Sequence, residues 1–512
     1  MTTCRFICAL VACVALAAVS LLIADEPVYD AWSWLVWGRE LAQLELDTTS
    51  GPAWKPLPAL LAVPLSLTGD LAPQLWLVLV RTAWLMALLL AAQISLVLTA
   101  GRPRAARIAG AAFAALCVGL LADEVTHWSR QVAGGMAEPL LVALVLGAIS
   151  AALAGRLPTV LVLGGLAALL RPEAFPLLAL YGLWCWRAEP RMRSTRPTRP
   201  TRPVRPVRPV RPVRPVRPVR PIRPLAMAVA LVVPALWLLP ELLGGGSGAS
   251  AQRAQTQSGD PLEALGWALA LPLAVTWPLA LAALPDRRAR VLGAGALAWI
   301  GLVAAMTLAG FAGLPRFMAP AAAIVGVLGG AGLAALLARP VRPTRPVRPV
   351  RPVRPVRPIR PRAPIAALGL AALAVTIVGL HGRAGQVPHA WSSAARISDS
   401  HDRLRKLAGS VGRRRLLACG RLATSDVLVR TALAWRLGVP LSHVVSFGTR
   451  PRRSGAFVVG LQASPGLRRD VRAAATRVAQ VGEWRLYSIG CPATASSSPP
   501  AARSAGVSGA RR

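Results

Sequence analysis

The sequence predicts an all-α polytopic membrane protein that carries a small α+β module at its C-terminal end. Of the 512 residues, 54% are hydrophobic and only 16% are charged, whereas a soluble chain of this length would carry about 25% charged residues. The apolar residues are gathered in long runs of the kind that cross a bilayer as helices. The arginines also lie mostly in one set of alternate loops and the acids in the other set, which is typical of a chain that crosses a membrane many times.

Eleven apolar segments are predicted to be transmembrane helices. The first is interpreted as an uncleaved anchor, because its apolar run continues well past Cys13. A shorter apolar stretch at 57–67 is expected to lie at the membrane interface. The eleven segments lie near residues 5–24, 74–99, 108–122, 137–154, 158–170, 174–187, 225–243, 262–284, 291–309, 317–338 and 364–381.

The distribution of charge predicts one orientation. With the N-terminus in the cytoplasm, the arginines near residues 102–107, 156 and 287–290 fall on the cytoplasmic side. Of the 16 acids before residue 390, all but Glu189 and Asp286 fall on the opposite side. The prediction is a multi-pass protein of the cytoplasmic (inner) membrane, with a cytoplasmic N-terminus and an extracytoplasmic C-terminal module.

Two low-complexity loops, Arg196–Pro224 and Arg339–Pro361, hold 18 of the arginines. Proline at every third position favours polyproline II, whose three-residue turn would align the arginines along one edge. That edge would be attracted to anionic headgroups, although a tolerated low-complexity expansion explains the same composition. Because the repeats supply so much of the net charge of +38, that charge does not indicate nucleic-acid binding.

Three regions are predicted: a membrane domain at 1–381 with repeat loops at 195–224 and 339–362, a module at 382–492, and a disordered tail at 493–512. Within the module we expect a split-βαβ order. Cys419 and Cys491 could pair if the module is exported, but this order would place them at opposite edges of the sheet. The expected elements are a strand at 415–419, a helix at 425–437, strands at 443–447 and 456–461, a helix at 467–480 and a strand at 483–490.

The loop at residues 25–58 holds the first candidate site residues. It contains six of the 21 acids, including the adjacent pair Asp25 and Glu26, and it contains Lys55, one of only two lysines among 59 basic residues. A carboxylate where a helix meets water can act as a general base, and a lysine can bind a phosphate. The simpler interpretation of such acids is a solvated helix cap.

Other ionisable residues fall on the same side of the membrane, some of them at or within its boundary. Groups at that depth are costly and generally pair or line a cavity. Carboxylates mixed with lysine and arginine suit a site that binds an anionic headgroup and takes a proton from a hydroxyl or amine. The set on this side comprises Asp25, Glu26, Asp30, Lys55, Asp123, Glu124, His127, Arg130, Glu138, Arg171, Glu173, Arg253 and Arg316.

Several of these residues stand in motifs that resemble the GT-C glycosyltransferases, in particular the lipid A aminoarabinose transferases and the protein O-mannosyltransferases. The resemblance covers about residues 1–340 and rests on the order of the motifs. The leucine after Pro56 departs from the family's KPP element. The motifs are Asp25-Glu26-Pro27-x-Tyr29, Trp54-Lys55-Pro56-Leu57, Arg81, Asp123-Glu124, Glu138-Pro139, Leu170-Arg171-Pro172-Glu173 and Pro315-Arg316-Phe317-x-x-Pro320.

The resemblance implies a GT-C-like membrane domain that moves a sugar, with inversion, from a polyprenyl-phosphate donor to a cell-envelope glycan, lipid or protein. Asp25 would be the general base, with Glu26 as the neighbouring candidate. Lys55 with Arg171 or Arg316 would neutralise the lipid phosphate. Asp123 or Glu124 would be a second acid that orients the acceptor or holds a divalent metal (Mg²⁺ or Mn²⁺). The need for a metal stays open, since two separated acids are a weak ligand set.

Two other functions also stay open. A flippase or transporter for a lipid-linked intermediate would line its path with the same charges, but it predicts charges through the membrane depth and an inverted repeat. A non-catalytic protein of the same fold would use the module to bind cell-envelope polymer. Membrane lipids are expected partners in every case, and nucleic acid in none.

Overall fold

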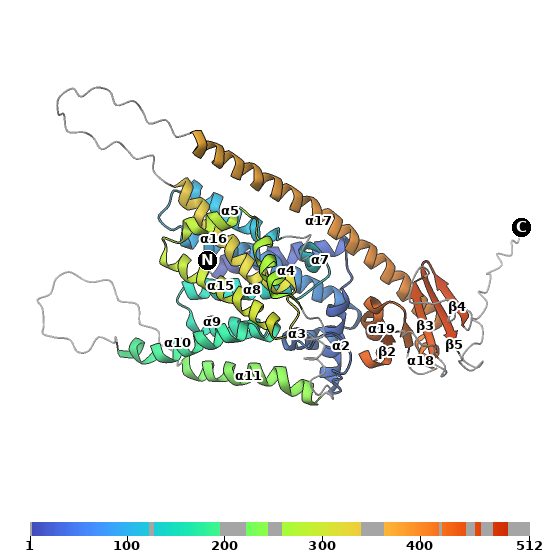
Figure 1. Cartoon of the computed structure of the whole chain (residues 1–512). Helices are drawn as coiled ribbons and strands as arrows, with labels where there is room; N and C mark the ends of the chain where they lie inside the picture. Colours follow the sequence, from blue (N-terminus) through green and yellow to red (C-terminus); the bar gives the residue numbers. More distant parts are fainter. Residues whose placement is uncertain are drawn as a thin grey trace, which may run out of the picture.

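The computed structural model describes residues 3–121, 127–194, 222–243, 259–338, 363–418, 422–446, 456–461 and 475–489. In these residues a bundle of helices forms the main body, and a small sheet lies at one end of it (Figure 1). Residues 195–221 and 339–362 of the Arg-Pro loops lie outside the described residues, as do Asp123, Glu124, Cys419, Cys491 and the predicted tail.

Each of the eleven predicted apolar segments contains a helix, and the segment at 262–284 contains two. Five of the described helices are long and apolar enough to cross a membrane, so the chain is a multi-pass membrane protein; the count of eleven spans is not confirmed. The helices of the body are α1 (Thr3–Val19), α2 (Tyr29–Gln43), α3 (Pro56–Ser66), α4 (Ala72–Leu98), α5 (Arg104–Gly119), α7 (Trp128–Ala133), α8 (Glu138–Leu153), α9 (Leu157–Leu170), α10 (Ala174–Ser194), α11 (Ile222–Leu243), α13 (Pro261–Ala270), α14 (Thr276–Ala283), α15 (Arg287–Leu308) and α16 (Ala319–Leu337).

Proline marks the start of several helices. Pro56, Pro139 and Pro320 occupy the first turns of α3, α8 and α16, where the missing N–H costs nothing and the fixed φ favours the helix. Asp286 begins α15 differently, because its carboxylate accepts hydrogen bonds from the main-chain N–H groups of Arg288 and Ala289. These signals set where the helices start. The site described below uses the residue before α3, the first residue of α8 and the segment ahead of α16.

The centre of the bundle is helix α16, which is buried along most of its length between α4, α5, α14 and α15. Small residues let the helices approach closely. A Cβ atom on Gly110 of α5 would overlap the carbonyl oxygen of Gly330 in α16, and a Cβ atom on Gly332 would overlap the carbonyl oxygen of Leu279 in α14. Close backbone contact through small residues is the usual packing of helices in a bilayer.

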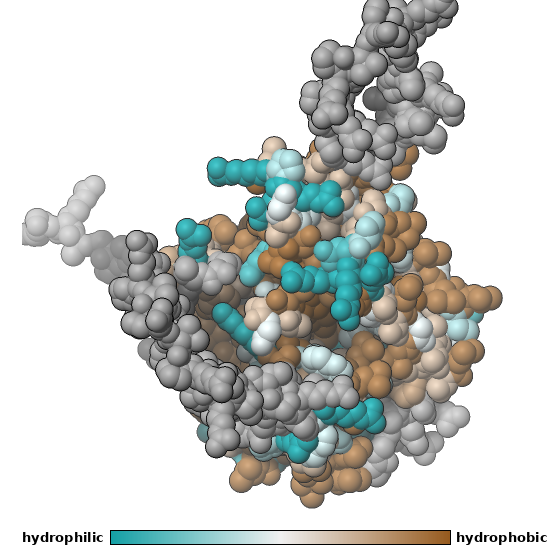
Figure 2. Space-filling view, turned by 90° about the vertical axis from the view of Figure 1, so that its left-hand side faces the viewer, coloured by the Kyte–Doolittle hydropathy of each residue, from teal (hydrophilic) through white to brown (hydrophobic). Residues whose placement is uncertain are grey.

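The outside of the bundle is apolar. Leu16 of α1, Leu231 of α11 and Leu297 of α15 are each at least 60% exposed. In Figure 2 hydrophobic residues cover most of the described surface, and hydrophilic residues gather in a few patches. An exposed apolar surface of this extent suits contact with lipid.

Helix α17 (Ala363–Val411) is a single helix of 49 residues that runs along the bundle and ends at the sheet (Figure 1). The sheet has the order β2-β1-β3-β5-β4, in which β1 is parallel to β2 and β3, and β5 is antiparallel to β3 and β4. The module comprises α18 (Arg413–Leu417), β1 (Leu422–Thr424), α19 (Arg430–Leu437), β2 (Val444–Ser446), β3 (Ala456–Leu461), β4 (Thr476–Val481) and β5 (Trp484–Ile489).

Two elements predicted for the module are wrong. Residues 415–417 of the strand expected at 415–419 form the end of α18, and the first described strand comes later, at Leu422. The helix expected at 467–480 is wrong in its last part, because Thr476–Val481 forms β4. A two-residue turn at Gly482 and Glu483, with positive φ at the glycine, folds β4 back onto β5. The strands predicted near β2, β3 and β5 are confirmed.

The module packs directly on α2. The ring of Trp435 in α19 lies 6.3 Å from that of Trp32. The guanidinium of Arg39 donates hydrogen bonds to the carbonyl oxygens of Ala434, Trp435 and Val439, where α19 ends. The carbonyl groups at the C-terminal end of a helix carry partial negative charge, so a cation is favoured there. Helix α2 therefore joins the bundle to the module.

Gly332→Ala is expected to destabilise the protein, because the added methyl would push α16 away from the main chain of α14. The apparent Tm of the detergent-solubilised protein should fall by several degrees. Gly301→Ala in α15, where the methyl would meet no atom within 4 Å, is the matched control and should leave the Tm unchanged or slightly raised. Equal Tm values for the two variants would contradict the packing of α14 on α16.

Candidate active site

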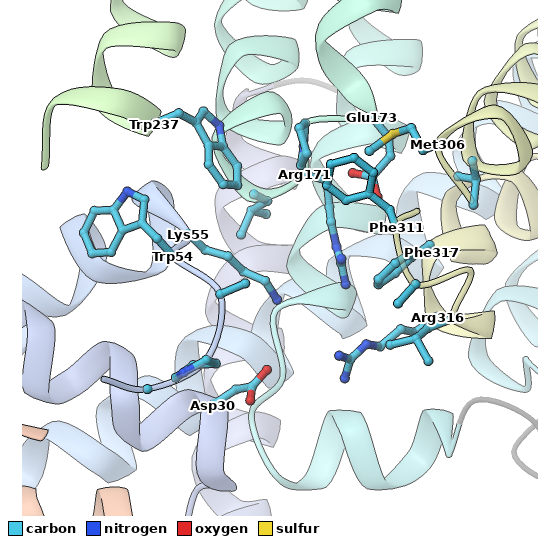
Figure 3. A pocket seen from close by; sticks show the side chains of 18 of the residues that line it. Asp30, Trp54, Lys55, Arg171, Glu173, Trp237, Met306, Phe311, Arg316 and Phe317 are labelled. Atoms are coloured by element: carbon cyan, nitrogen blue, oxygen red, sulfur yellow. The ribbon is translucent and has the colours of Figure 1, made fainter. Parts of the chain in front are cut away.

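A cavity of about 540 Å³ lies where several helices end. Its charged residues come from the start of α2, the loop before α3, the turn after α9, the end of α11 and the segment before α16 (Figure 3). Its volume is in the range of small-molecule sites, about 300–1,000 Å³. The ionisable residues that line it are Asp30, Lys55, Arg171, Glu173, Glu241 and Arg316.

Lys55 is the residue before α3, where the main chain is extended, and only 7% of its surface is exposed. Its ammonium nitrogen is 5.1 Å from the centre of the Trp34 ring, a cation–π contact. The pKa of Lys55 is lowered to about 8, mainly by burial and also by the nearby Arg171 guanidinium, while Glu138 and Asp30 oppose the shift. The site therefore holds this charge weakly, and an anion beside it would raise the pKa again.

Arg171 and Arg316 share one buried carboxylate. Glu138, whose side chain is 1% exposed, accepts a hydrogen bond from Arg171, and its Oε1 atom lies 3.8 Å from Nε of Arg316. The Arg171 guanidinium also lies 4.0 Å from the centre of the Phe317 ring. A buried carboxylate is stable only when it is paired, so Glu138 holds the two arginines at one wall of the cavity.

One side of the cavity is apolar. Trp237 and Leu238 come from α11, and Val303 and Met306 come from α15, with Phe311 in the loop that follows. Both helices are among those that could cross a membrane. Figure 3 shows Trp237, Met306 and Phe311 around the upper part of the cavity and the three cations below them. The cavity thus combines a cationic part with an apolar part.

All three predicted donor-phosphate residues, Lys55, Arg171 and Arg316, line this cavity. They come from three separate parts of the chain, and the fold brings them to one cavity. In Figure 3 their charged ends point toward the same space. From the sequence, Glu138 and Asp30 have no assigned role, because only the fold shows which groups they face.

The predicted catalytic acids are placed differently. Asp25 and Glu26 do not line this cavity. The main-chain N–H of Asp25 donates to Oγ of Ser398 in α17, and Arg81 binds the carbonyl oxygen of the preceding residue, Ala24. The catalytic role of Asp25 therefore remains a prediction.

Glu26 forms part of the contact with the module. Its carboxylate, 6% exposed, accepts a hydrogen bond from Arg436 of α19 and lies 3.2 Å from Nδ1 of His401 in α17. The same Arg436 lies over the ring of Trp32. A buried carboxylate with two partners is engaged in holding α2, α17 and α19 together.

The second predicted acid, Asp123 or Glu124, lies outside the described residues. Among the residues that the structure describes, no group of three His, Cys, Asp or Glu side chains could hold a metal ion. Whether the protein requires Mg²⁺ or Mn²⁺ stays open, as it does from the sequence.

No protein-family model matches the chain, and no curated protein sequence matches it. The chain is similar to one solved membrane transferase. This is ArnT from Cupriavidus metallidurans, in a crystal structure bound to undecaprenyl phosphate, with 15% identity and a TM-score of 0.49 over 95% of this chain and 98% of that one. ArnT is a GT-C lipid A aminoarabinose transferase, the family that the motifs resemble. A likeness this distant decides no function, which has to be argued from the chain's own residues.

Glu138→Gln is expected to lower the thermal stability of the protein, because it keeps the shape of the side chain but leaves Arg171 and Arg316 without their shared charge. The apparent Tm should fall by several degrees. Glu263→Gln, at an exposed position of α13, is the control. An unchanged Tm for Glu138→Gln would show that the carboxylate does not hold the arginines.

Proposed function

We propose that the chain is a membrane glycosyltransferase that moves a sugar from a polyprenyl phosphate to a cell-envelope acceptor at the outer face of the cytoplasmic membrane. The observation that carries the proposal is the group of Lys55, Arg171 and Arg316 around one cavity. The motifs that contain these three residues are those that resemble the GT-C glycosyltransferases. Motif order and cavity geometry thus support the same class of function.

The three cations suit the leaving group of this reaction. As the acceptor forms its bond to the anomeric carbon, the bond from that carbon to the phosphate oxygen breaks, and the electron pair stays on the phosphate. A phosphodiester with one negative charge becomes a monoester with two. Fixed positive charge around the phosphate therefore stabilises the transition state more than the ground state.

The cations differ in their freedom to move. Arg171 is held by Glu138 and by the Phe317 ring, so its guanidinium is preorganised. Among the described residues Lys55 makes no ion pair within 4.0 Å, so its ammonium is available for a ligand. The apolar side of the cavity, with Trp237 and Met306, supports a prenyl chain that enters from the membrane.

The proton of the acceptor has to leave as the new bond forms. The motif assigns this step to Asp25, and Asp25→Asn, which keeps the shape but removes the proton acceptor, should lower transfer by about 10²–10⁴-fold. Donor binding should change little, because the phosphate does not depend on that proton. Full transfer by this variant would remove Asp25 from the mechanism and leave the donor site untouched.

Lys55 offers the experiment that tests the proposal. With purified protein and a polyprenyl-phosphate sugar, Lys55→Ala should weaken donor binding and lower turnover, since it removes a charge from the phosphate site. Lys55→Arg should also be impaired, because a planar guanidinium does not replace a compact ammonium in a buried position. Wild-type activity and donor affinity in Lys55→Arg would speak against a specific contact between Lys55 and the phosphate.

Lipid-phosphate binding is expected to depend on pH because of Lys55. The free protein loses the proton of Lys55 near pH 8, where a phosphate monoester is already fully ionised. The affinity for undecaprenyl phosphate should therefore weaken by up to about tenfold per pH unit above pH 8. Below pH 8 the affinity should be flat until the phosphate itself takes up a proton, and proton uptake on binding near pH 8 should be measurable by calorimetry in two buffers.

The stability of the unliganded protein should change in the opposite sense. Between pH 8 and the ordinary lysine pKa, about 10.4, the unfolded chain binds the proton that the folded chain has lost, so the free energy of unfolding should rise with pH. Lys55→Arg should remove both effects, because arginine stays charged throughout this range. A Lys55→Arg variant with the wild-type pH profile would place the titration elsewhere.

A further inference from the structure

Asp30 is one of three carboxylates that line the cavity beside the cations, together with Glu173 and Glu241. Asp30 lies in the first turn of α2, and in Figure 3 its side chain points into the space between Lys55 and Arg316. It is close enough to Lys55 to act on the pKa of that ammonium. Among the described residues it nevertheless makes no ion pair within 4.0 Å.

Three other carboxylates in this part of the structure are less available. Glu138 is shared by Arg171 and Arg316, and Glu26 is bound by Arg436 and His401. Glu173 is 4% exposed, and one of its oxygens is fully buried. Asp30 is half-buried, so it keeps contact with the open space of the cavity.

The position of Asp30 is fixed from outside the cavity. The hydroxyl of Thr431 in the module donates a hydrogen bond of 3.0 Å to the carbonyl oxygen of Tyr29, the residue before Asp30. The next turn of α2 is held by fully buried tryptophans, with Trp34 packed on Trp76. The main chain that carries Asp30 is therefore held beside the cations by contacts that do not involve a ligand.

We propose that Asp30 is a specificity-determining residue that accepts a hydrogen bond from a hydroxyl or ammonium group of the donor sugar. This inference rests on the proposed function. The phosphate of the donor carries the prenyl chain on one side and the sugar on the other, and only the sugar has hydroxyl or ammonium groups that can donate a hydrogen bond to a carboxylate. A carboxylate repels a bound phosphate, and a hydrogen bond from the sugar to this carboxylate would offset that repulsion. No bond is made or broken in this step.

Asp30→Asn is expected to affect lipid phosphates with and without a sugar differently. Asp30→Asn removes a negative charge near the phosphate, so the affinity for undecaprenyl phosphate, which has no sugar, should stay the same or increase. The affinity for the mannosyl and arabinosyl phosphates of the same prenol should decrease by about tenfold or more for whichever of the two the wild type prefers, because the hydrogen bond to a charged acceptor is lost. The changes therefore have opposite signs.

The measurements are equilibrium binding of the three lipids to purified full-length protein, with steady-state transfer where it occurs. Asp30→Asn should raise KM for the donor more than it lowers kcat, and Asp30→Glu should recover part of the affinity. Asp70→Asn, at an exposed position, is the control for loss of an acid elsewhere. The Tm of each variant reports whether α2 is still in place.

Three results would overturn the assignment. One is an Asp30→Asn variant that binds all three lipids more tightly, since Asp30 would then be only an electrostatic neighbour of Lys55. The second is a loss of kcat at unchanged donor affinity, which would make Asp30 a proton acceptor instead. The third is wild-type protein that binds lipids with and without the sugar equally well. Wild-type protein that binds none of these lipids would instead remove the proposed function itself.

Discussion

Burial of the Glu138 carboxylate is the constraint on which the arrangement of the cavity depends. A carboxylate that is 1% exposed cannot stay ionised without partners, and it takes them from the turn after α9 and from the segment before α16. Arg171 and Arg316 are thereby drawn to the same wall, although 144 residues separate them in sequence. The ion pair therefore fixes the relative position of three helix ends, and the cavity is the space left between them and the loop of Lys55.

Helix α2 is constrained from both sides. Its first turn and Trp34 contact the cavity and Lys55, while Glu26, Trp32 and Arg39 contact the module. The module thus packs against the helix that carries Asp30 and Trp34, although no module residue lines the cavity. The alternative in which the module serves only to bind cell-envelope polymer gives no reason for so many buried polar contacts with α2, although it does not conflict with them.

The sequence predicted where the apolar helices form, and it singled out three cations that line one cavity, while their role at a phosphate remains a prediction. Apolar segments are long and are bounded by proline and arginine, and Lys55 stands out where arginine has replaced almost all lysines. Asp30 could not be chosen over Asp25 in this way, because both follow the same helix and only packing decides which one meets the cavity. The strand β4 was missed because Ala473, Ala474 and Ala475 favour a helix locally, whereas pairing with β5 decides the outcome.

Helix α17 has a consequence for how the chain can vary in length. Its 49 residues carry Arg383, which binds carbonyl oxygens at the ends of α5 and α13, and also Ser400 and Arg403, which bind β5 and the turn before it. The helix is therefore held at Arg383 by the bundle and at Ser400 and Arg403 by the module, and no loop between these points could absorb an inserted residue. One residue added in this interval would turn the module by about 100° and lift it by about 1.5 Å relative to the bundle. The face of α19 that meets α2 would then point elsewhere. Only insertions or deletions close to a whole number of helical turns would keep this contact.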